Sequence, residues 1–88
     1  MHIQVSGQHI SIGSSIQEYV IERISAVVKK YSIEAQSGHV HFSKHGREFA
    51  CDIVVNEGSG RHMIMKSNCT SDEIYNAFDI ALTKLEKQ

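Results

Sequence analysis

The sequence predicts an α+β fold in which a four-stranded sheet carries two helices on one face. Three observations support it: the periodic segments follow the order β-α-β-β-β-α, each helical segment has one apolar stripe, and two such stripes need only one sheet face to cover them. The opposite face would be open to water, which suits an antiparallel or mixed sheet. Because 88 residues suffice for one domain, we assign residues 1–88 to a single domain.

The first two elements are predicted to be a short strand and a long helix. Residues 2–6 alternate between polar and apolar side chains, and Gly7 is expected to end this strand. A helix is predicted over residues 14–31, where Ser15 and Glu18 have the spacing of a capping box. Its apolar stripe is expected to contain five residues: Ile16, Val20, Ile24, Val27 and Tyr31.

A hairpin is predicted in the middle of the chain, after a connecting loop over residues 32–38. Residues 39–43 alternate, with Val40 and Phe42 on one face. The four residues that follow are typical of a turn around Gly46. In the next strand the inward positions are expected to be Phe49, Cys51, Ile53 and Val55.

A fourth strand is predicted over residues 61–67, after a turn at residues 56–60. Its register has two interpretations, because two alternating sets of side chains fit the inward positions. One set is Met63 with Met65, and the other is His62, Ile64 and Lys66. Cys69 is expected in the loop that follows.

The last element is predicted to be a helix over residues 72–88, capped by Thr70, Ser71 or Asp72. Thr70 and Glu73 have a second capping-box spacing. The acids of the first turn and the lysines near the end, Lys84 and Lys87, are placed favourably for the helix dipole. The apolar stripe contains Ile74, Phe78, Ala81, Leu82 and Leu85.

The composition argues against several classes of function. No apolar run is long enough to cross a bilayer, and the N-terminus has no secretory pattern. Cys51 and Cys69 are too few for a disulfide framework or a zinc motif, so we expect a reduced, cytoplasmic protein. No phosphate loop or nucleophile motif is present, and Asp52, Glu57 and Asp79 are scattered carboxylates. We therefore expect neither enzymatic activity nor a cofactor.

Three histidines are expected on the open face of the sheet. His2, His39 and His41 share that face, and Asp52 joins them, because alternate residues of a strand point to the same side. A histidine pair at i and i+2 can hold zinc or nickel. Polar residues are also expected on a wet face, and no cysteine or fixed spacing completes a site, so no metal site is predicted.

The net charge of −1 constrains any binding of nucleic acid, since proteins that contact phosphates usually carry a basic surplus. If the chain binds RNA, its positive charge must be concentrated on one face. The candidate RNA-binding residues are Arg23, Lys29, Lys30, Lys84 and Lys87 on the helices, with Lys44 and Arg47 in the central turn. The alternative interpretation is that these side chains are solvated and that the helical lysines favour the helix C-termini. Tyr75 is expected either to stack on a base or to be half-buried beside Phe42 or Phe49.

Five segments together have the pattern of a known family: Met1–Gly7, Val20–Ile24, Val40–Lys44, Phe49–Ile53 and Asp72–Asp79. With Gly60 and the basic end at Lys84–Gln88, they resemble the ribosome hibernation-promoting factor family, also described as ribosome-associated translation inhibitors. The resemblance covers essentially all 88 residues. The last of the five segments resembles the Asp-aliphatic-Tyr-x-Ala-x-Asp signature of the family, although Glu73 and Ala26 depart from the usual residues.

The resemblance implies a double-stranded-RNA-binding-domain-like fold that binds the small ribosomal subunit and its rRNA in the channel for messenger and transfer RNA. Binding there would block initiation and promote hibernation. The resemblance also favours RNA contacts for Arg23, Lys29, Lys84 and Lys87, which would form one basic ridge if the helices pack side by side. Long family members have a further dimerising domain that pairs ribosomes, so a short form, a long form and a homodimer all stay open.

Two other functions are consistent with the sequence. The first is a non-enzymatic protein-interaction module that uses the open sheet face or its edges. The second, which has less support, is a metal-dependent enzyme that uses the histidines.

Overall fold

The chain folds into a sheet with two helices, in the order predicted from the sequence. The computed structural model describes the backbone of residues 2–31, 35–57 and 64–87, and the side chains of residues 2–31, 37–56 and 71–87. The elements are β1 (His2–Gln8), α1 (Ser14–Lys30), β2 (Ala35–His45), β3 (Glu48–Glu57), β4 (Ile64–Ser71) and α2 (Ile74–Glu86).

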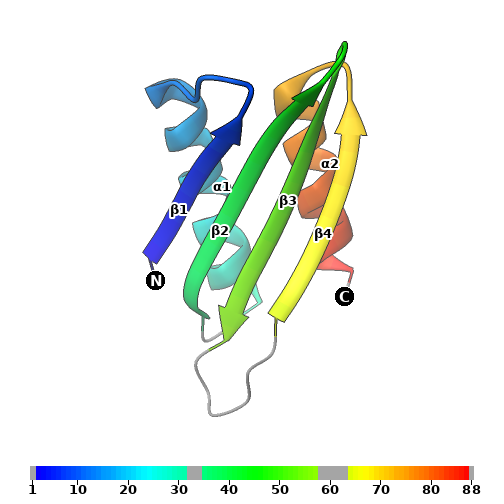
Figure 1. Cartoon of the computed structure of the whole chain (residues 1–88). Helices are drawn as coiled ribbons and strands as arrows, with labels where there is room; N and C mark the ends of the chain where they lie inside the picture. The colour runs from blue at the N-terminus through cyan, green and yellow to red at the C-terminus, as the bar shows by residue number, and fades with distance from the viewer. Residues whose placement is uncertain (1, 32–34, 58–63, 88) are drawn as a thin grey trace.

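The sheet is mixed and has the strand order β1-β2-β3-β4. Strand β1 pairs in parallel with β2, whereas the β2–β3 and β3–β4 pairs are antiparallel. A parallel pair needs a crossover connection, and α1 provides it. Both helices lie behind the same face of the sheet (Figure 1). The α+β class is therefore confirmed, while the likeness to double-stranded-RNA-binding domains stays a prediction.

The core lies between the helices and the covered face of the sheet. The aromatic rings of Phe42 and Phe78 meet there, with their centroids 6.4 Å apart. The inward positions predicted for the second and third strands are confirmed, although Phe49 is only half-buried. The buried apolar residues are Ile16, Val20, Ile24, Val40, Phe42, Cys51, Ile53, Val55, Ala77, Phe78, Ala81, Leu82 and Leu85.

The prediction that Tyr31 belongs to the apolar stripe of α1 is wrong. Tyr31 is 48% exposed, because the helix ends at Lys30 and Tyr31 forms its C-cap. Both predicted capping boxes are also wrong. Helix α1 begins at Ser14, so Ser15 is already inside it, and Gly13 is the N-cap. Glu73 is the N-cap of α2, and no side chain caps either helix.

The strands extend beyond the alternation that predicted them, since pairing with a neighbouring strand continues where the sequence pattern stops. Strand β1 passes Gly7 and ends at Gln8, and β2 begins inside the predicted loop at Ala35. Strand β4 is described from Ile64 and continues to Ser71, beyond the predicted end at residue 67.

Because β4 continues to Ser71, Cys69 lies in a strand opposite Cys51, not in a loop. Met65 pairs with Val55 in the same register. The alternatives involving His62 and Met63, and the side-chain orientation of this strand, lie outside the described residues. The predicted turn around Gly46 is confirmed, and its φ of 64° is a conformation that glycine adopts without strain.

We expect substitutions in α1 to separate core packing from surface exposure. Ile24→Ala should lower the free energy of unfolding by about 2–5 kcal/mol, because it opens a cavity in the core. Ile21→Ala on the same helix makes the same chemical change at a residue that is 41% exposed, and should change stability by less than about 1 kcal/mol. Urea denaturation measures both. Equal losses would contradict the packing described above.

Candidate nucleic-acid interface

The two helices face each other with side chains of opposite charge. On α1, Tyr19, Arg23 and Lys30 share one flank, since residues four and seven positions apart lie on the same side of a helix. On α2, Asp79 and Glu86 are seven positions apart and share the flank that faces α1. The interface between the helices therefore carries carboxylates as well as cations.

Three side chains of this interface contact one another. The Tyr19 hydroxyl donates a hydrogen bond of 2.7 Å to Asp79 Oδ1. Arg23 Nη2 lies 4.0 Å from the same oxygen, and Arg23 Cζ lies 5.7 Å from the centre of the Tyr19 ring. Asp79, one of the carboxylates that are scattered in the sequence, therefore has two partners on α1 that the sequence did not predict.

Tyr75 joins this cluster from the first turn of α2. Its ring packs edge-to-face with that of Tyr19, with centroids 5.0 Å apart and an interplanar angle of 78°. Tyr19 also contacts the buried ring of Phe78, at 5.8 Å. Tyr75 itself is 41% exposed. A row of aromatic rings thus leads from Phe78 in the core through Tyr19 to Tyr75 at the surface. The sequence did not predict Tyr19 as the neighbour of Tyr75.

Asp79 changes the chemistry of the Tyr19 phenol. The hydrogen bond to Asp79 raises the pKa of Tyr19 above its ordinary value of 10.0, and partial burial and the negative charge of Asp79 act in the same direction. The positive charge of Arg23 acts in the opposite direction and is outweighed. Tyr19 is therefore a neutral hydrogen-bond donor over the physiological range.

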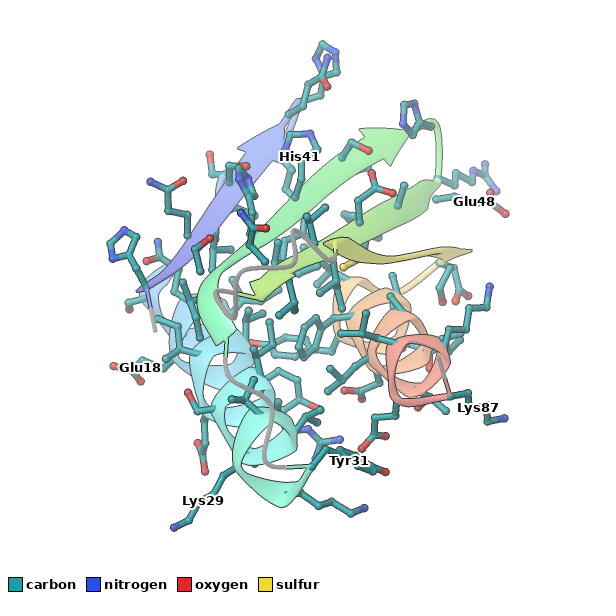
Figure 2. All side chains as sticks on the ribbon, turned by 90° about the horizontal axis from the view of Figure 1, so that it is seen from below. Glu18, Lys29, Tyr31, His41, Glu48 and Lys87 are labelled. Atoms are coloured by element: carbon teal, nitrogen blue, oxygen red, sulfur yellow. The ribbon has the colours of Figure 1, made fainter. Side chains whose placement is uncertain are left out.

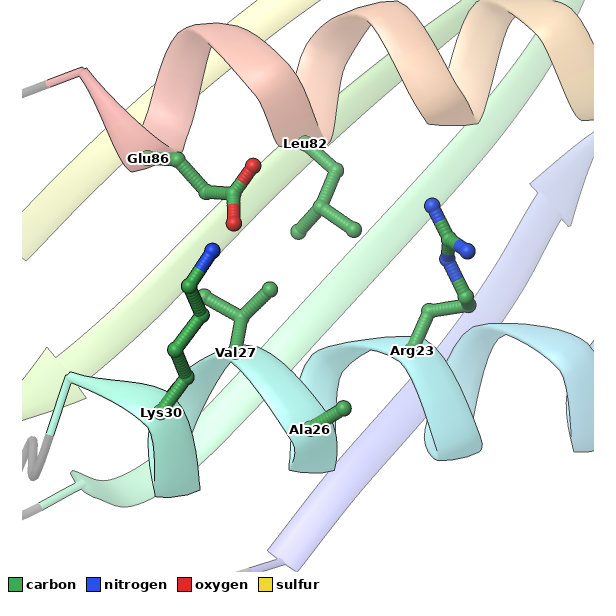
Figure 3. A pocket seen from close by; sticks show the side chains of 6 residues that line it. All are labelled: Arg23, Ala26, Val27, Lys30, Leu82 and Glu86. Carbon is green, nitrogen blue, oxygen red and sulfur yellow. The ribbon is translucent and has the colours of Figure 1, made fainter.

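A shallow hollow of about 220 Å³ lies further along the two helices. Figure 3 shows the ends of Lys30 and Glu86 pointing toward one another across it, with Arg23 at the other end. Val27 and Leu82 form its apolar floor. Lys30 also lies over the Tyr31 ring, with Nζ 5.2 Å from the ring centre. Arg23 and Lys30, the two cations on this flank of α1, therefore lie on the same side as the acids of α2, Asp79 and Glu86.

The remaining helical cations point away from the interface between the helices. Lys29 and Lys87 extend toward opposite outer sides of the helical layer (Figure 2). Lys84 lies about 140° around α2 from Asp79, because each residue turns the helix by about 100°. The fold thus brings Arg23 and Lys30 to one flank but does not gather the helical cations into one continuous ridge.

The basic turn lies at the other end of the molecule. Lys44 and Arg47 belong to the β2–β3 hairpin, which is opposite the C-terminal ends of both helices in Figure 1. Lys44 Nζ lies 5.5 Å from the centre of the Phe49 ring, which holds the ammonium over an aromatic face. Lys44 and Arg47 therefore lie at the opposite end of the molecule from the lysines near the helix C-termini, and Arg23 lies between these two groups in the middle of α1.

The open face of the sheet carries the predicted histidines. Ser6 Oγ lies 2.8 Å from His39 Nε2 and 2.9 Å from His41 Nδ1. His39, His41, Asp52 and Val54 line a hollow of about 330 Å³. The shared face is confirmed for these residues. Among the described side chains, no three metal-ligating groups converge on a common point.

The sequence analysis missed the roles of Tyr19, Asp79 and Glu86. A signal was present, since Tyr19 and Arg23 are four residues apart beside one apolar stripe, and the two acids are seven apart beside the other. Which flank of each helix faces the other helix is decided by packing. The spacing of these residues could therefore be interpreted as a contact only once the fold was known.

Comparison with known proteins agrees with this arrangement of elements. The Sigma 54 modulation protein / S30EA ribosomal protein family matches residues 3–88. The chain belongs to this family. The family consists of non-enzymatic ribosome-binding factors, in agreement with the prediction that the chain is not an enzyme.

Two curated relatives are named ribosome hibernation promotion factor. The protein of Rhizobium meliloti is 32% identical over 88 residues, which is 100% of this chain and 45% of the relative. The protein of Bradyrhizobium diazoefficiens is 30% identical over 88 residues and is covered to 42%. The chain thus spans less than half the length of these relatives. Their names associate the family with ribosome hibernation and translation regulation.

Two solved structures share the fold. A ribosomal subunit interface protein from Coxiella burnetii has a TM-score of 0.81 and 24% identity, with 100% of this chain and 92% of that chain covered. The N-terminal domain of Protein Y from Thermus thermophilus has a TM-score of 0.84 and 22% identity, with 100% of this chain and 94% of that chain covered.

Within the described residues, neither helix is long and apolar enough to span a bilayer.

We expect the titration of Tyr19 to report its contact with Asp79. Its pKa should lie above 10.0 in the folded protein and return toward 10.0 in Asp79→Asn, which removes the negative charge. Because the pKa is raised by folding, this contribution to stability is complete below pH 10 and is lost as the pH rises through the folded-state value.

The measurement is an NMR titration of ring-labelled tyrosine. Glu86→Gln is the control, because it removes one negative charge from the same flank of α2 while leaving the Tyr19–Asp79 hydrogen bond in place. A Tyr19 pKa that moves equally in both variants would argue against a specific contact.

Proposed function

We propose that residues 1–88 form a single ribosome-binding domain that occupies the small ribosomal subunit in the channel for messenger and transfer RNA. Occupancy of that channel would block initiation and keep idle ribosomes in storage. The observation that carries the proposal is the family match over residues 3–88, together with relatives named ribosome hibernation promotion factor that align with the whole chain.

The distribution of charge determines how such a chain would hold RNA. With a net charge of −1, it has little long-range attraction for a polyanion. Its contacts must therefore be local, at exposed cations such as Lys29 and Lys87 near the helix ends and Lys44 and Arg47 at the hairpin. Two groups of cations at opposite ends of the molecule favour a partner that contacts the domain from more than one side, as a channel lined by rRNA would.

The β2–β3 hairpin is the better placed of the two groups for entering a groove. It projects beyond the helical layer in Figure 1, and its tip carries Lys44 and Arg47 next to Gly46. Double-stranded RNA is recognised largely through its shape and through contacts with its backbone, which a basic hairpin can supply.

Pairing of ribosomes is a separate activity. The resemblance assigns it to a dimerising domain of long family members, and the curated relatives are more than twice as long as this chain. We assign channel binding to residues 1–88, and this assignment includes neither the pairing of ribosomes nor a homodimer.

The alternative function is a protein-interaction module on the open sheet face. The feature it would use is the hollow between His39, His41, Asp52 and Val54. Light scattering that shows a pH-dependent dimer, together with no affinity for ribosomal subunits, would favour it over ribosome binding. The family match is the reason for preferring ribosome binding.

We expect the lysines near the end of α2 to contribute to ribosome binding. Lys84→Gln with Lys87→Gln should weaken co-sedimentation with isolated small subunits, because fewer phosphates are neutralised. The salt dependence should also fall, by about 0.7–0.9 in the slope of log K against log salt for each phosphate that these lysines neutralise. Circular dichroism checks that the helix is retained.

The matched control is Gln4→Glu with Gln8→Glu on β1. Both pairs lower the net charge by two, but the control changes a strand on the other side of the molecule from α2. If both pairs of substitutions weakened binding equally, the loss would be explained by net charge alone, and Lys84 and Lys87 would not belong to the binding site. No co-sedimentation of the unmodified chain at low salt would contradict the proposed function itself.

A further inference from the structure

We infer that Tyr75 and Arg23 form a site for one unpaired RNA nucleotide, with the base stacked on Tyr75 and the adjacent phosphate held by Arg23. The inference rests on the proposed function and specifies the kind of RNA that this surface takes. Both residues contact the ring of Tyr19, with Tyr75 at 5.0 Å between centroids and Arg23 Cζ at 5.7 Å from the ring centre. Tyr19 thus contacts both the ring of Tyr75 and the guanidinium of Arg23.

The Tyr75 ring is suited to accept a base. It is 41% exposed although it belongs to the first turn of a helix whose other aromatic residue, Phe78, is fully buried. Its contact with Tyr19 is edge-to-face at 78°, so the two rings do not cover one another by stacking face to face. An exposed tyrosine that is held in place by a second aromatic ring loses little conformational entropy when a base stacks on it.

Arg23 remains available to a phosphate despite its acidic neighbour. Its side chain is 52% exposed, and its distance of 4.0 Å from Asp79 is too long for a hydrogen bond. Asp79 Oδ1 already accepts the shorter bond from Tyr19. A guanidinium has five N–H donors, so a weak ion pair through one nitrogen leaves donors for a bidentate contact with phosphate.

Asp79 acts in this site as a positioning residue. It accepts the Tyr19 hydroxyl at 2.7 Å and so fixes the ring on which both Tyr75 and Arg23 pack. It also attracts the guanidinium toward the interface between the helices. An acid in the middle of an RNA-binding surface would ordinarily weaken binding by repulsion, whereas here the loss of its carboxylate should disturb the geometry of the two residues that contact RNA.

The occupant follows from this chemistry. A base in a duplex is already stacked on both sides and cannot lie on a protein ring, whereas a base in a loop, bulge or single strand can. Stacking on aromatic side chains is tolerant of sequence because every base has a π-face. The site therefore selects unpaired RNA over paired RNA without selecting a particular base.

The first test compares two RNA probes that carry the same number of phosphates, a short unstructured strand and a blunt-ended duplex without unpaired nucleotides. Fluorescence anisotropy at low salt should show tighter binding of the unstructured strand. Tyr75→Leu should weaken that binding about fivefold or more, because stacking contributes about 1–3 kcal/mol per base. Tyr75→Phe keeps the ring and should retain the affinity. A Tyr75→Leu variant that binds both probes as tightly as the unmodified chain would overturn the stacking site.

The second test separates positioning from charge. Asp79→Asn and Glu86→Gln each remove one negative charge from the same flank of α2. If charge alone mattered, both would bind RNA more tightly. We expect Glu86→Gln to bind the unstructured strand more tightly and Asp79→Asn to bind it less tightly. Equal tightening in the two variants would overturn the positioning role of Asp79.

The outcomes also separate this inference from the proposed function. If the unmodified chain co-sediments with small subunits but shows no preference for the unstructured strand, the nucleotide site is wrong and the ribosome-binding function stands. If it neither co-sediments nor binds either probe, both are wrong. Thermal unfolding of each variant confirms that a change in affinity is measured on folded protein.

Discussion

The packing of two apolar helix stripes against a single face of the sheet is the constraint on which the other features depend. Val20 and Ile24 of α1 and Phe78 and Leu82 of α2 are buried against the same layer of strands. This burial leaves each helix one orientation about its own axis, because turning it would expose the stripe to water. Once that orientation is set, the flanks beside the two stripes must face each other. Tyr19 and Asp79 then meet although they are 60 residues apart in the chain.

The charges of this protein act through local geometry more than through a general field. Lys30 faces Glu86 across a shallow hollow, and Arg23 lies near Asp79 at a distance typical of a weak ion pair. A partly exposed pair such as Arg23–Asp79 adds little stability, at most about 1 kcal/mol. Its larger effect is to orient a long, flexible cation. A nearly neutral domain can present guanidinium and ammonium groups in defined places while avoiding the non-specific attraction to nucleic acid that a basic surface brings.

The two faces of the sheet have different physical tasks. The covered face is apolar along β2 and β3 and supplies the core, whereas the open face carries His39, His41 and Asp52. Ser6 on β1 contacts both imidazole rings and so links the parallel strand to its neighbour on the wet side. Since the family match covers residues 3–88, this division between a buried helical side and a polar open side belongs to the part of the chain that relates it to ribosome hibernation factors.

Local periodicity in the sequence determined the α+β class, the order of the six elements and the inward residues of β2, β3 and both helices, because alternation and helical spacing depend only on near neighbours along the chain. Tertiary structure decided where the elements end. Strands β2 and β4 continue beyond their patterns because partner strands supply hydrogen bonds, and Tyr31 is exposed because α1 stops at Lys30. The fold also decided which flank of α1 lies beside α2. An apolar stripe specifies the side of a helix that is buried but not the neighbour beside it. The sequence therefore indicates no partner for Asp79, whereas packing places it against Tyr19 and Arg23.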